Sequence, residues 1–308
     1  MGFYSLRMVI NDVLVALPAL AIVAGCSASS GGGSFGGGAP VDLPADTVTV
    51  DCDGKLACDP TGKGEAPGSV CVQTVDARLV SLDGSPVPDT MVTVCGKNLC
   101  ARGKSNTSGE VHVAVCHSVA EPAFELEGGA RYVTFAVPIS RSISSIGTLT
   151  LVPLPAEGDD LASAAHAGAT VQSAGIGLAF AAGTEVAFDV ADAFDTDAQR
   201  FRAAVVPRDR APPSVQPASG IDLVVGIAPV RAVLSLPARL SVPNAAGWAP
   251  GAAVRLFQHG VDPLGEGPAP FGRWTDAGTA RVSDDGATIT TDEPFGLTYL
   301  APVGLGRI

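Results

Sequence analysis

Short runs in which apolar and polar residues alternate recur along the chain from about residue 70 onward. In the run VDARLV, Val75, Ala77 and Leu79 alternate with Asp76 and Arg78, which is the period of a strand that is buried on one face. Glycine, proline, asparagine and aspartate separate such runs at intervals of about 8 to 12 residues, a spacing typical of β-sandwiches. The pattern therefore predicts many short antiparallel strands.

The alternating runs fall into two stretches, residues 69–154 and 167–302. Between them, residues 155–166 (AEGDDLASAAHA) are small and polar, and we expect them to form a linker. In the second stretch, Pro237 and Pro243 bracket the run ARLSV. Because proline cannot donate a hydrogen bond to a central ladder, an edge strand or a bent strand is expected there.

Composition supports an all-β fold class. The 308 residues are 46% hydrophobic, enough for two modest domains with packed cores at about 150 residues per domain. Aromatic residues make up only 5%, whereas the chain has 37 glycines and 24 prolines. Glycine and proline interrupt helices, and β-branched residues suit a pleated surface, so this mixture favours short strands and turns.

The charge balance excludes one class of partner. The formal net charge is −12 and the sequence pI is about 4.6. Nucleic-acid binding relies on clustered lysine and arginine to displace counterions, and the sequence has no basic patch of this kind. We therefore predict no nucleic-acid partner, and the acidity is expected to keep the folded part soluble.

The first 25 residues have the features of a targeting segment. Arg7 precedes the apolar run VLVALPALAIVAG, which is too short to span a bilayer of about 30 Å as a helix. The run ends in Val23-Ala24-Gly25-Cys26, which resembles the lipobox of bacterial lipoproteins. The resemblance implies a signal peptide over residues 1–25, cleavage before Cys26, and attachment of diacylglyceryl and a further acyl chain such as palmitate to that cysteine. Two or more acyl chains anchor a protein stably to a membrane.

The segment after Cys26 is predicted to be a tether. Residues 26–45 consist largely of glycine, serine and alanine, which cannot bury enough apolar area to offset the entropy of ordering them. Ser27, in place of an aspartate, implies by the same resemblance an outer-membrane destination in the bacterial cell envelope. The match Gly32-Gly33-Ser34-Phe35-Gly36 to the G-x-S-x-G hydrolase motif lacks the strand-to-helix context that a nucleophile requires.

Removing Cys26 from the seven cysteines leaves an even number, as expected for an oxidising compartment. The candidates for disulfides are Cys52, Cys58, Cys71, Cys95, Cys100 and Cys116, of which the first two lie in a lead-in segment, residues 46–68. A zinc site is the alternative, with Cys95 and Cys100 beside His112 and His117. Only the two histidines have ligand-like spacing, so we predict three disulfides and no metal.

Residues 69–154 contain a series of turn and strand motifs. The series consists of Asp83-Gly84-Ser85-Pro86-Val87-Pro88, Val92-Thr93-Val94 and Asn106-Thr107-Ser108-Gly109-Glu110-Val111. It resembles the carboxypeptidase-regulatory-like, transthyretin-like domains, which implies a seven-stranded immunoglobulin-like sandwich used for spacing or binding. Among the 15 pairings that six cysteines allow, we expect Cys95 with Cys100, Cys52 with Cys58, and Cys71 with Cys116.

Residues 167–302 contain a second set of motifs, which consists of Ala182-Gly183-Thr184, Leu236-Pro237, Pro243-Asn244 with Gly247 and Gly251, Trp274, and Asp284-Asp285-Gly286. The set resembles the β-sandwich repeats of secreted bacterial lipoproteins and, more distantly, the sandwich shared by netrin receptors, ankyrins and tight-junction scaffolds. It implies a second immunoglobulin-like antiparallel sandwich. Some of these relatives cleave themselves at a His-Phe-Ser turn. The corresponding Pro294-Phe295-Gly296 lacks a base and a hydroxyl nucleophile, so no self-cleavage is expected.

Few residues suggest a site. Trp248, Phe271 and Trp274 are candidates for an exposed platform that stacks on sugar or peptide, with core packing as the alternative. An acidic turn contains Asp192, Asp195 and Asp197. We expect these side chains to be solvated, with a metal site as the alternative. No P-loop, dinucleotide fingerprint or HExxH motif is present, so no catalytic residue and no cofactor are predicted.

These features predict a non-enzymatic, envelope-anchored lipoprotein that presents β-sandwich modules for adhesion, scaffolding or ligand binding. Its predicted partners are the membrane, through the lipid anchor, and an unknown protein or glycan ligand. The alternative is an envelope enzyme, or an enzyme accessory, that acts on glycan or peptide through carboxylates on loops. A further alternative is secretion without lipid. Converging carboxylates or histidines in a cleft would favour an enzyme, whereas exposed aromatic side chains on sandwich faces would favour binding.

Overall fold

The computed structural model describes residues 52, 58, 59, 68–126, 129, 131–215, 219–293 and 296–308. The predicted signal peptide, Cys26, the tether and the dipeptide at 294–295 lie outside the described residues. Residues 42–308 group into one compact unit. Within the described ranges, no helix has the length and apolar character needed to cross a membrane.

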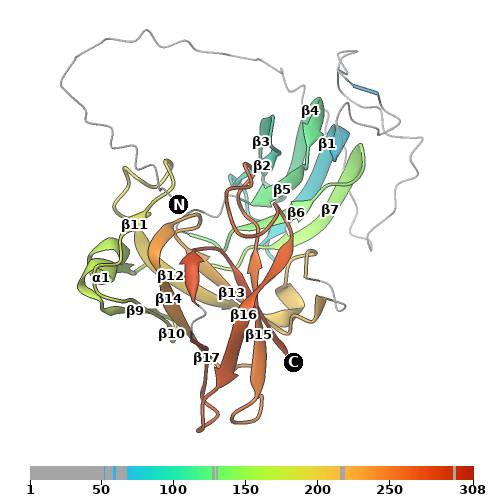
Figure 1. The fold of residues 1–308 in the computed structure, drawn as a ribbon. Coiled ribbons are helices and arrows are strands. Elements are labelled where there is room, and N and C mark those ends of the chain that lie inside the picture. The colour runs from blue at the N-terminus through green and yellow to red at the C-terminus, as the bar shows by residue number, and fades with distance from the viewer. Residues whose placement is uncertain are drawn as a thin grey trace, which may run out of the picture. The chain divides into compact units, whose positions relative to one another are not determined.

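The fold is all-β, as the hydrophobic pattern predicts. The elements, most of which are labelled in Figure 1, are β1 (Ser69–Val80), β2 (Met91–Cys95), β3 (Cys100–Lys104), β4 (Glu110–Ala120), β5 (Ala123–Leu126), β6 (Phe135–Pro138), β7 (Ile143–Thr150), β8 (Asp159–Asp160), α1 (Leu161–Ala167), β9 (Thr170–Ser173), β10 (Ile176–Ala179), β11 (Val186–Ala187), β12 (Arg200–Val206), the 3₁₀ turn η1 (Arg208–Arg210), β13 (Leu223–Ala228), β14 (Val233–Pro243), β15 (Ala253–His259), β16 (Trp274–Val282), β17 (Thr288–Thr291), β18 (Leu297–Tyr299) and β19 (Val303–Arg307).

The strands β1–β7 form a sandwich-like pair of sheets. One sheet has the order β4-β1-β7 and the other has the order β3-β2-β5-β6, and a core of mainly valine and leucine lies between them. The predicted alternation in β1 is confirmed, because Val75, Ala77 and Leu79 are buried while Arg78 is exposed. β1 pairs antiparallel with β4 and parallel with β7.

The second half differs from the predicted sandwich. Its strands form a single sheet of order β8-β12-β13-β19-β15-β16-β17-β14-β10-β9, with β11 and β18 paired to β14. The two ends of this order come together where Ser173 Oγ of β9 accepts a hydrogen bond from the Ala203 N–H of β12 at 2.9 Å. Twist accumulates along a run of antiparallel strands, and a register shift between Leu256 and Phe257 of β15 adds to it. The result is a near-barrel.

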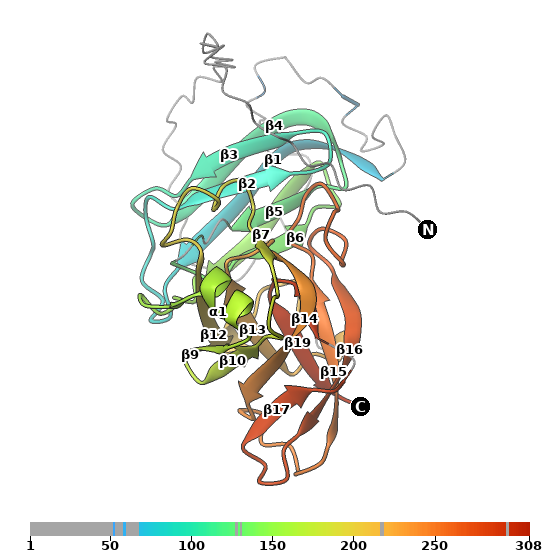
Figure 2. The ribbon, with the colours of Figure 1, turned by 60° about the vertical axis from the view of Figure 1, so that its left-hand side comes forward.

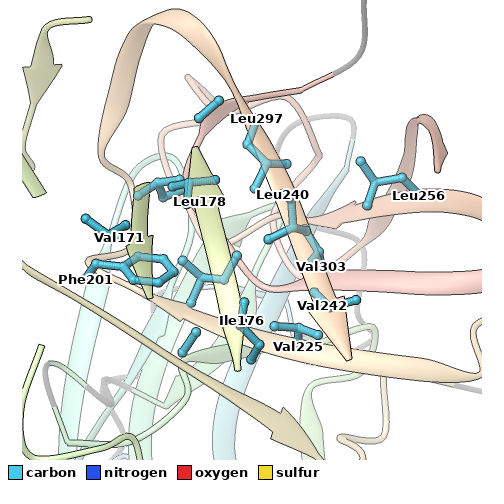
Figure 3. Close-up of a cluster of buried hydrophobic side chains, with 14 of the residues drawn as sticks. Val171, Ile176, Leu178, Phe201, Val225, Leu240, Val242, Leu256, Leu297 and Val303 are labelled. Carbon is cyan, nitrogen blue, oxygen red and sulfur yellow. The ribbon is translucent and has the colours of Figure 1, made fainter. Parts of the chain in front are cut away.

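Apolar side chains fill the near-barrel. Its core draws on nearly every strand of the sheet and on α1. In Figure 3, Val171 and Phe201 lie close together, and Ile176, Val225 and Val242 project into the same interior. Burial of these side chains stabilises the fold by about 25 cal/mol per Å² of apolar surface removed from water.

The expected linker, 155–166, contains β8 and most of α1. The Asp160 carboxylate accepts a hydrogen bond from the Ser163 N–H at 2.8 Å and so caps the helix, which ends at Gly168 with a φ of 71°. Leu161 and Ala165 are buried in the barrel core. Figure 2 shows the helix beside β9. The small residues that suggested a linker therefore allow a short helix to pack closely.

The prolines of β14 fit the bent strand that was expected. Pairing of β14 with β18 is interrupted between Val233 and Ala238, and Pro237 lies within the interruption. Pro243 is the last residue of the strand. β14 is nevertheless an interior strand, because β10 and β17 pair with its second half on opposite sides.

Three disulfides use all six predicted cysteines, but two of the expected pairings are wrong. Cys95 pairs with Cys100 as expected, whereas Cys52 pairs with Cys116 and Cys58 with Cys71. The reason lies in the register of β1 and β4. Cys71 is opposite Ser118, and Cys116 falls at the irregularity between Val72 and Thr74, so the two cysteines are not partners across the ladder. Each instead binds one cysteine of the lead-in segment to the sandwich.

The three disulfides close loops of very different length, with sequence separations of 64, 13 and 5. The chain-entropy model predicts that Cys52→Ser/Cys116→Ser lowers the free energy of unfolding by about 4 kcal/mol, and that the matched pair Cys95→Ser/Cys100→Ser lowers it by about 2 kcal/mol. Urea denaturation checks the order. Mass mapping of unreduced peptides checks the pairing, and a peptide that joins Cys52 to Cys58 would contradict it.

Candidate functional site

The sandwich and the near-barrel share a buried seam. We use this name for the cluster in which Val133, Phe135, Val152 and Leu154 pack against Val206, Ile221, Val224 and Ala228, together with the polar residues at its border. β13 is buried on both faces, since Val225 points into the barrel while Val224 points into the seam. Gly226 lies directly against the Val133 side chain, where a Cβ would not fit. The two halves are therefore closely packed along the seam.

One buried histidine closes the edge of the sandwich. β6 is the outermost strand of its sheet, so alternate backbone groups on its outer side lack a strand partner. His259, at the end of β15, places Nε2 3.1 Å from both the N and the O of Ala136 in β6. Whichever neutral tautomer is present, Nε2 satisfies one of these two backbone groups.

The surroundings of His259 keep its ring neutral. The side chain is fully buried between Phe135, whose ring centroid is 5.9 Å away, and Trp274, whose centroid is 4.6 Å away. Burial lowers the pKa of His259 to about 4, and hydrogen bonding with the backbone of Ala136 and Arg273 only partly opposes this effect. A protonated ring would be a charge in an apolar pocket.

A buried ion pair forms the polar border of the seam. Glu125 of β5 is 2% exposed, and one of its oxygens lies 2.5 Å from Arg231 Nη2. The guanidinium also donates from Nε to the Val261 carbonyl at 2.9 Å and lies 3.7 Å from Asp189. Although burial opposes the charged form, Glu125 and Asp189 raise the pKa of Arg231. Because Glu125 belongs to the sandwich and Arg231 to the barrel, the pair fixes the two halves in register.

Further ionisable groups surround this pair. Partial burial, reinforced by repulsion from Asp189 and Asp195, raises the pKa of Asp192 to about 6, while Arg231 opposes the shift. Burial and the charge of Asp262 raise the pKa of Tyr299 well above its usual value. The structure thus brings together carboxylates that are far apart in sequence, and it places an arginine among them.

The structure separates the three candidate aromatic residues. Phe271 is 7% exposed in a cluster with Cys95, Ala123 and Ala136, and Trp274 packs in the seam. Trp248 packs against the barrel core from the loop after β14. They form no common platform, so core packing, the alternative weighed above, describes Phe271 and Trp274.

Trp248 also lines a surface hollow of about 640 Å³. The charged residues of its lining are Arg208, Asp222 and Arg307, and the rest are apolar or small. Sequence reasoning missed these three residues because they come from the ends of three strands that only the sheet order brings together.

The candidate metal ligands have other roles. Cys95 and Cys100 are joined in a disulfide, and His112 Nδ1 lies 2.7 Å from the Asp76 carboxylate. In the acidic turn, Asp197 binds Arg202 at 2.6 Å, and the Arg202 side chain is only 1% exposed. Among the residues that the structure describes, no three histidine, cysteine or acidic side chains are grouped so as to hold a metal ion.

No family model matches this sequence, and no curated protein matches it. The function proposed below therefore rests on the residues and geometry of this chain.

The buried ion pair gives a prediction for stability. Arg231→Met leaves the buried Glu125 carboxylate without its main counter-charge, and is expected to lower the free energy of unfolding by about 3 kcal/mol in chemical denaturation. Adding Glu125→Gln to this variant removes the buried charge and should restore part of the loss. Lys97→Met is the matched control, because its partner Glu121 is half exposed, and a change of less than about 1 kcal/mol is expected. An Arg231→Met variant as stable as the control would contradict the role of the pair.

The buried histidine predicts a loss of stability in acid. The unfolded chain binds a proton on His259 near its ordinary pKa of 6.5, whereas the folded chain resists protonation down to about 4. The stability is complete above pH 6.5 and is lost as the pH falls toward 4, by about 3 kcal/mol in all. Thermal unfolding between pH 7 and pH 4 measures this loss, and His259→Gln should flatten the profile.

Asp192 acts with the opposite sign and serves as a control. Its pKa is raised in the folded chain, so the folded state takes up a proton first as the pH falls through 6 and is stabilised relative to the unfolded state. Asp192→Asn removes this gain, and the acid loss should become steeper. A profile that keeps its shape in both variants would show that neither group controls it.

Proposed function

We propose that the chain is a lipid-anchored protein of the bacterial cell envelope whose rigid β body binds a ligand or scaffolds a partner without catalysing a reaction. The observation that carries the proposal is the cysteine count. Six of the seven cysteines pair with one another, so Cys26 has no partner left within the chain. A single remaining cysteine that follows Val23-Ala24-Gly25 is what lipid attachment requires.

The three disulfides also support the proposed compartment. Disulfides form and persist in oxidising environments such as the periplasm and the cell surface. Two of them attach the lead-in segment to the sandwich, so the polypeptide that leaves the tether is covalently joined to the folded body. The proposal therefore has a continuous path from Cys26 through residues 27–45 to the sandwich.

The seam supports a holding role. Its apolar contacts, the His259 bridge to Ala136 and the ion pair between Glu125 and Arg231 join the sandwich to the near-barrel. Glu125 and Asp189 approach the same arginine, which commits these carboxylates to a structural pair. In this proposal, the sandwich is an immunoglobulin-like spacer of the carboxypeptidase-regulatory type, and the near-barrel is the part that presents a binding surface.

The anchor is tested at Cys26. Mass analysis of the mature amino terminus, with fatty-acid labelling of growing cells, should show an acylated Cys26, and the protein should enter the detergent-rich phase on phase separation. Cys26→Ser should leave an uncleaved or water-soluble product, whereas Ser27→Ala should behave like the native sequence. A mature chain that begins with a free amino group at another residue would refute the anchor.

A further inference from the structure

The hollow beside Trp248 lies at one mouth of the near-barrel. It is lined by the end of β12 with η1, the start of β13, the end of β19 and the loop after β14. These strands are consecutive in the sheet, in the order β12-β13-β19. The mouths of β-barrels are a common place for ligand sites, and a volume of about 640 Å³ lies within the usual range of about 300 to 1,000 Å³.

The hollow has an apolar floor. Val205, Leu223 and Trp248 line it and also belong to the barrel core or pack against it. Along β19, Val303 and Leu305 point into the barrel, and the two-residue period places Arg307 next in the same row. The apolar floor thus continues the core, and the row that fills the barrel ends in a cation at its mouth.

The rim of the hollow is more positive than the rest of the chain. Its charged side chains are two arginines and one aspartate, although the chain as a whole carries a net charge of −12. Arg208 lies 3.6 Å from Asp222 and is 77% exposed. Arg307 is exposed and has no ion-pair partner among the described residues. Guanidinium groups bind carboxylates in a bidentate manner, so the rim favours an anionic group.

The loop that carries Trp248 is held in place by Asn244. The Asn244 side-chain amide donates to the Trp248 carbonyl at 2.8 Å and to the Gly286 carbonyl at 2.9 Å, and its oxygen accepts from the Trp248 N–H at 3.0 Å. These bonds tie the loop to the turn between β16 and β17. The backbone of Trp248 is therefore held in place before any ligand arrives, which lowers the entropic cost of ordering the loop on binding.

We propose that this hollow binds an acidic saccharide, with a pyranose ring on Trp248 and its carboxylate held by Arg307 and Arg208. The proposal deepens the binding role proposed above and rests on that role, but it does not require the lipid anchor. The tryptophan offers a flat apolar surface, and Ala245, Ala246 and Gly247 form a wall without bulky side chains.

The geometry favours a sugar over an extended peptide. Peptides that add a strand to a sheet need a free strand edge. β13 and β19 each have a strand on both sides, and on the side of β12 away from β13 the ladder with β8 covers only Arg200 and Phe201, so the hollow offers a peptide no more than a short edge. A sugar ring that lies flat on the indole of Trp248 and presents a carboxylate to Arg208 and Arg307 needs only side chains that line the hollow.

The test uses the full-length protein and trigalacturonic acid as the probe, with neutral maltotriose as the comparison. The chain has two tryptophans, and Trp274 lies in the seam, so a change in tryptophan fluorescence on titration reports on Trp248. The acid should bind, maltotriose should bind at least about tenfold more weakly, and added salt should weaken the binding of the acid.

Variants assign the contacts. Arg307→Gln and Trp248→Ala should each weaken binding of the acid by at least about tenfold. Binding to these variants is measured by calorimetry, because Trp248→Ala removes the fluorescent reporter. Because Arg307 is exposed, Arg307→Gln is expected to fold normally. This variant therefore keeps the test valid if Trp248→Ala does not fold. Arg255→Gln is the matched control, since Arg255 is a half-exposed arginine on β15 that pairs with Asp276 and lies outside the hollow.

Several outcomes would overturn the proposal. These are no binding of the acid, equal binding of acid and neutral sugar, unchanged binding by Arg307→Gln, or binding only of a peptide through its terminal carboxylate. Cys26→Ser should bind the acid like the native chain. A native chain that binds the acid but does not partition into membranes would refute the anchor alone, and a native chain that partitions into membranes but does not bind the acid would refute the saccharide site alone.

Discussion

The backbone of one edge strand constrains the whole body. A strand at the edge of a sheet exposes polar groups that must find partners, and Ala136 of β6 finds its partner in the His259 ring from the other half of the molecule. The contact depends on a neutral His259 ring in apolar surroundings. The end of β15 therefore has to pack between Phe135 and Trp274. The seam is therefore a requirement of the sandwich as well as a contact surface of the barrel.

The seam combines groups whose electrostatic demands differ. His259 excludes a proton, Arg231 keeps its charge against burial because Glu125 and Asp189 face it, and Asp192 holds a proton more readily than a free aspartate. Desolvation acts on all three, and the outcome depends on whether an opposite charge is near. These contacts hold the surfaces of the two halves together, which suits a protein proposed to bind a ligand or to scaffold a partner.

The closure of the near-barrel creates the surface on which the binding proposal rests. Because successive antiparallel strands twist in one direction, β9 returns to β12 and the sheet encloses a core. The inward rows end at the barrel mouth, and there the ends of β12, β13 and β19 leave Arg208, Asp222 and Arg307 around Trp248. None of these residues has a sequence motif, and their proximity follows from sheet order alone.

The strand-rich class and the alternation in β1 could be predicted from the sequence, because both depend on neighbours along the chain. Of the three expected disulfides, only the pairing of Cys95 with Cys100, the two cysteines closest in sequence, is confirmed. The sequence also singled out Cys26 and the six disulfide cysteines. Tertiary structure alone decided the other disulfides, the near-barrel, the seam and the hollow. The apolar run LVVGIA of β13 is buried throughout, and only the tertiary structure shows which surfaces cover it. Such contacts join residues far apart in sequence, and their register depends on twist and bulges that accumulate over the whole sheet.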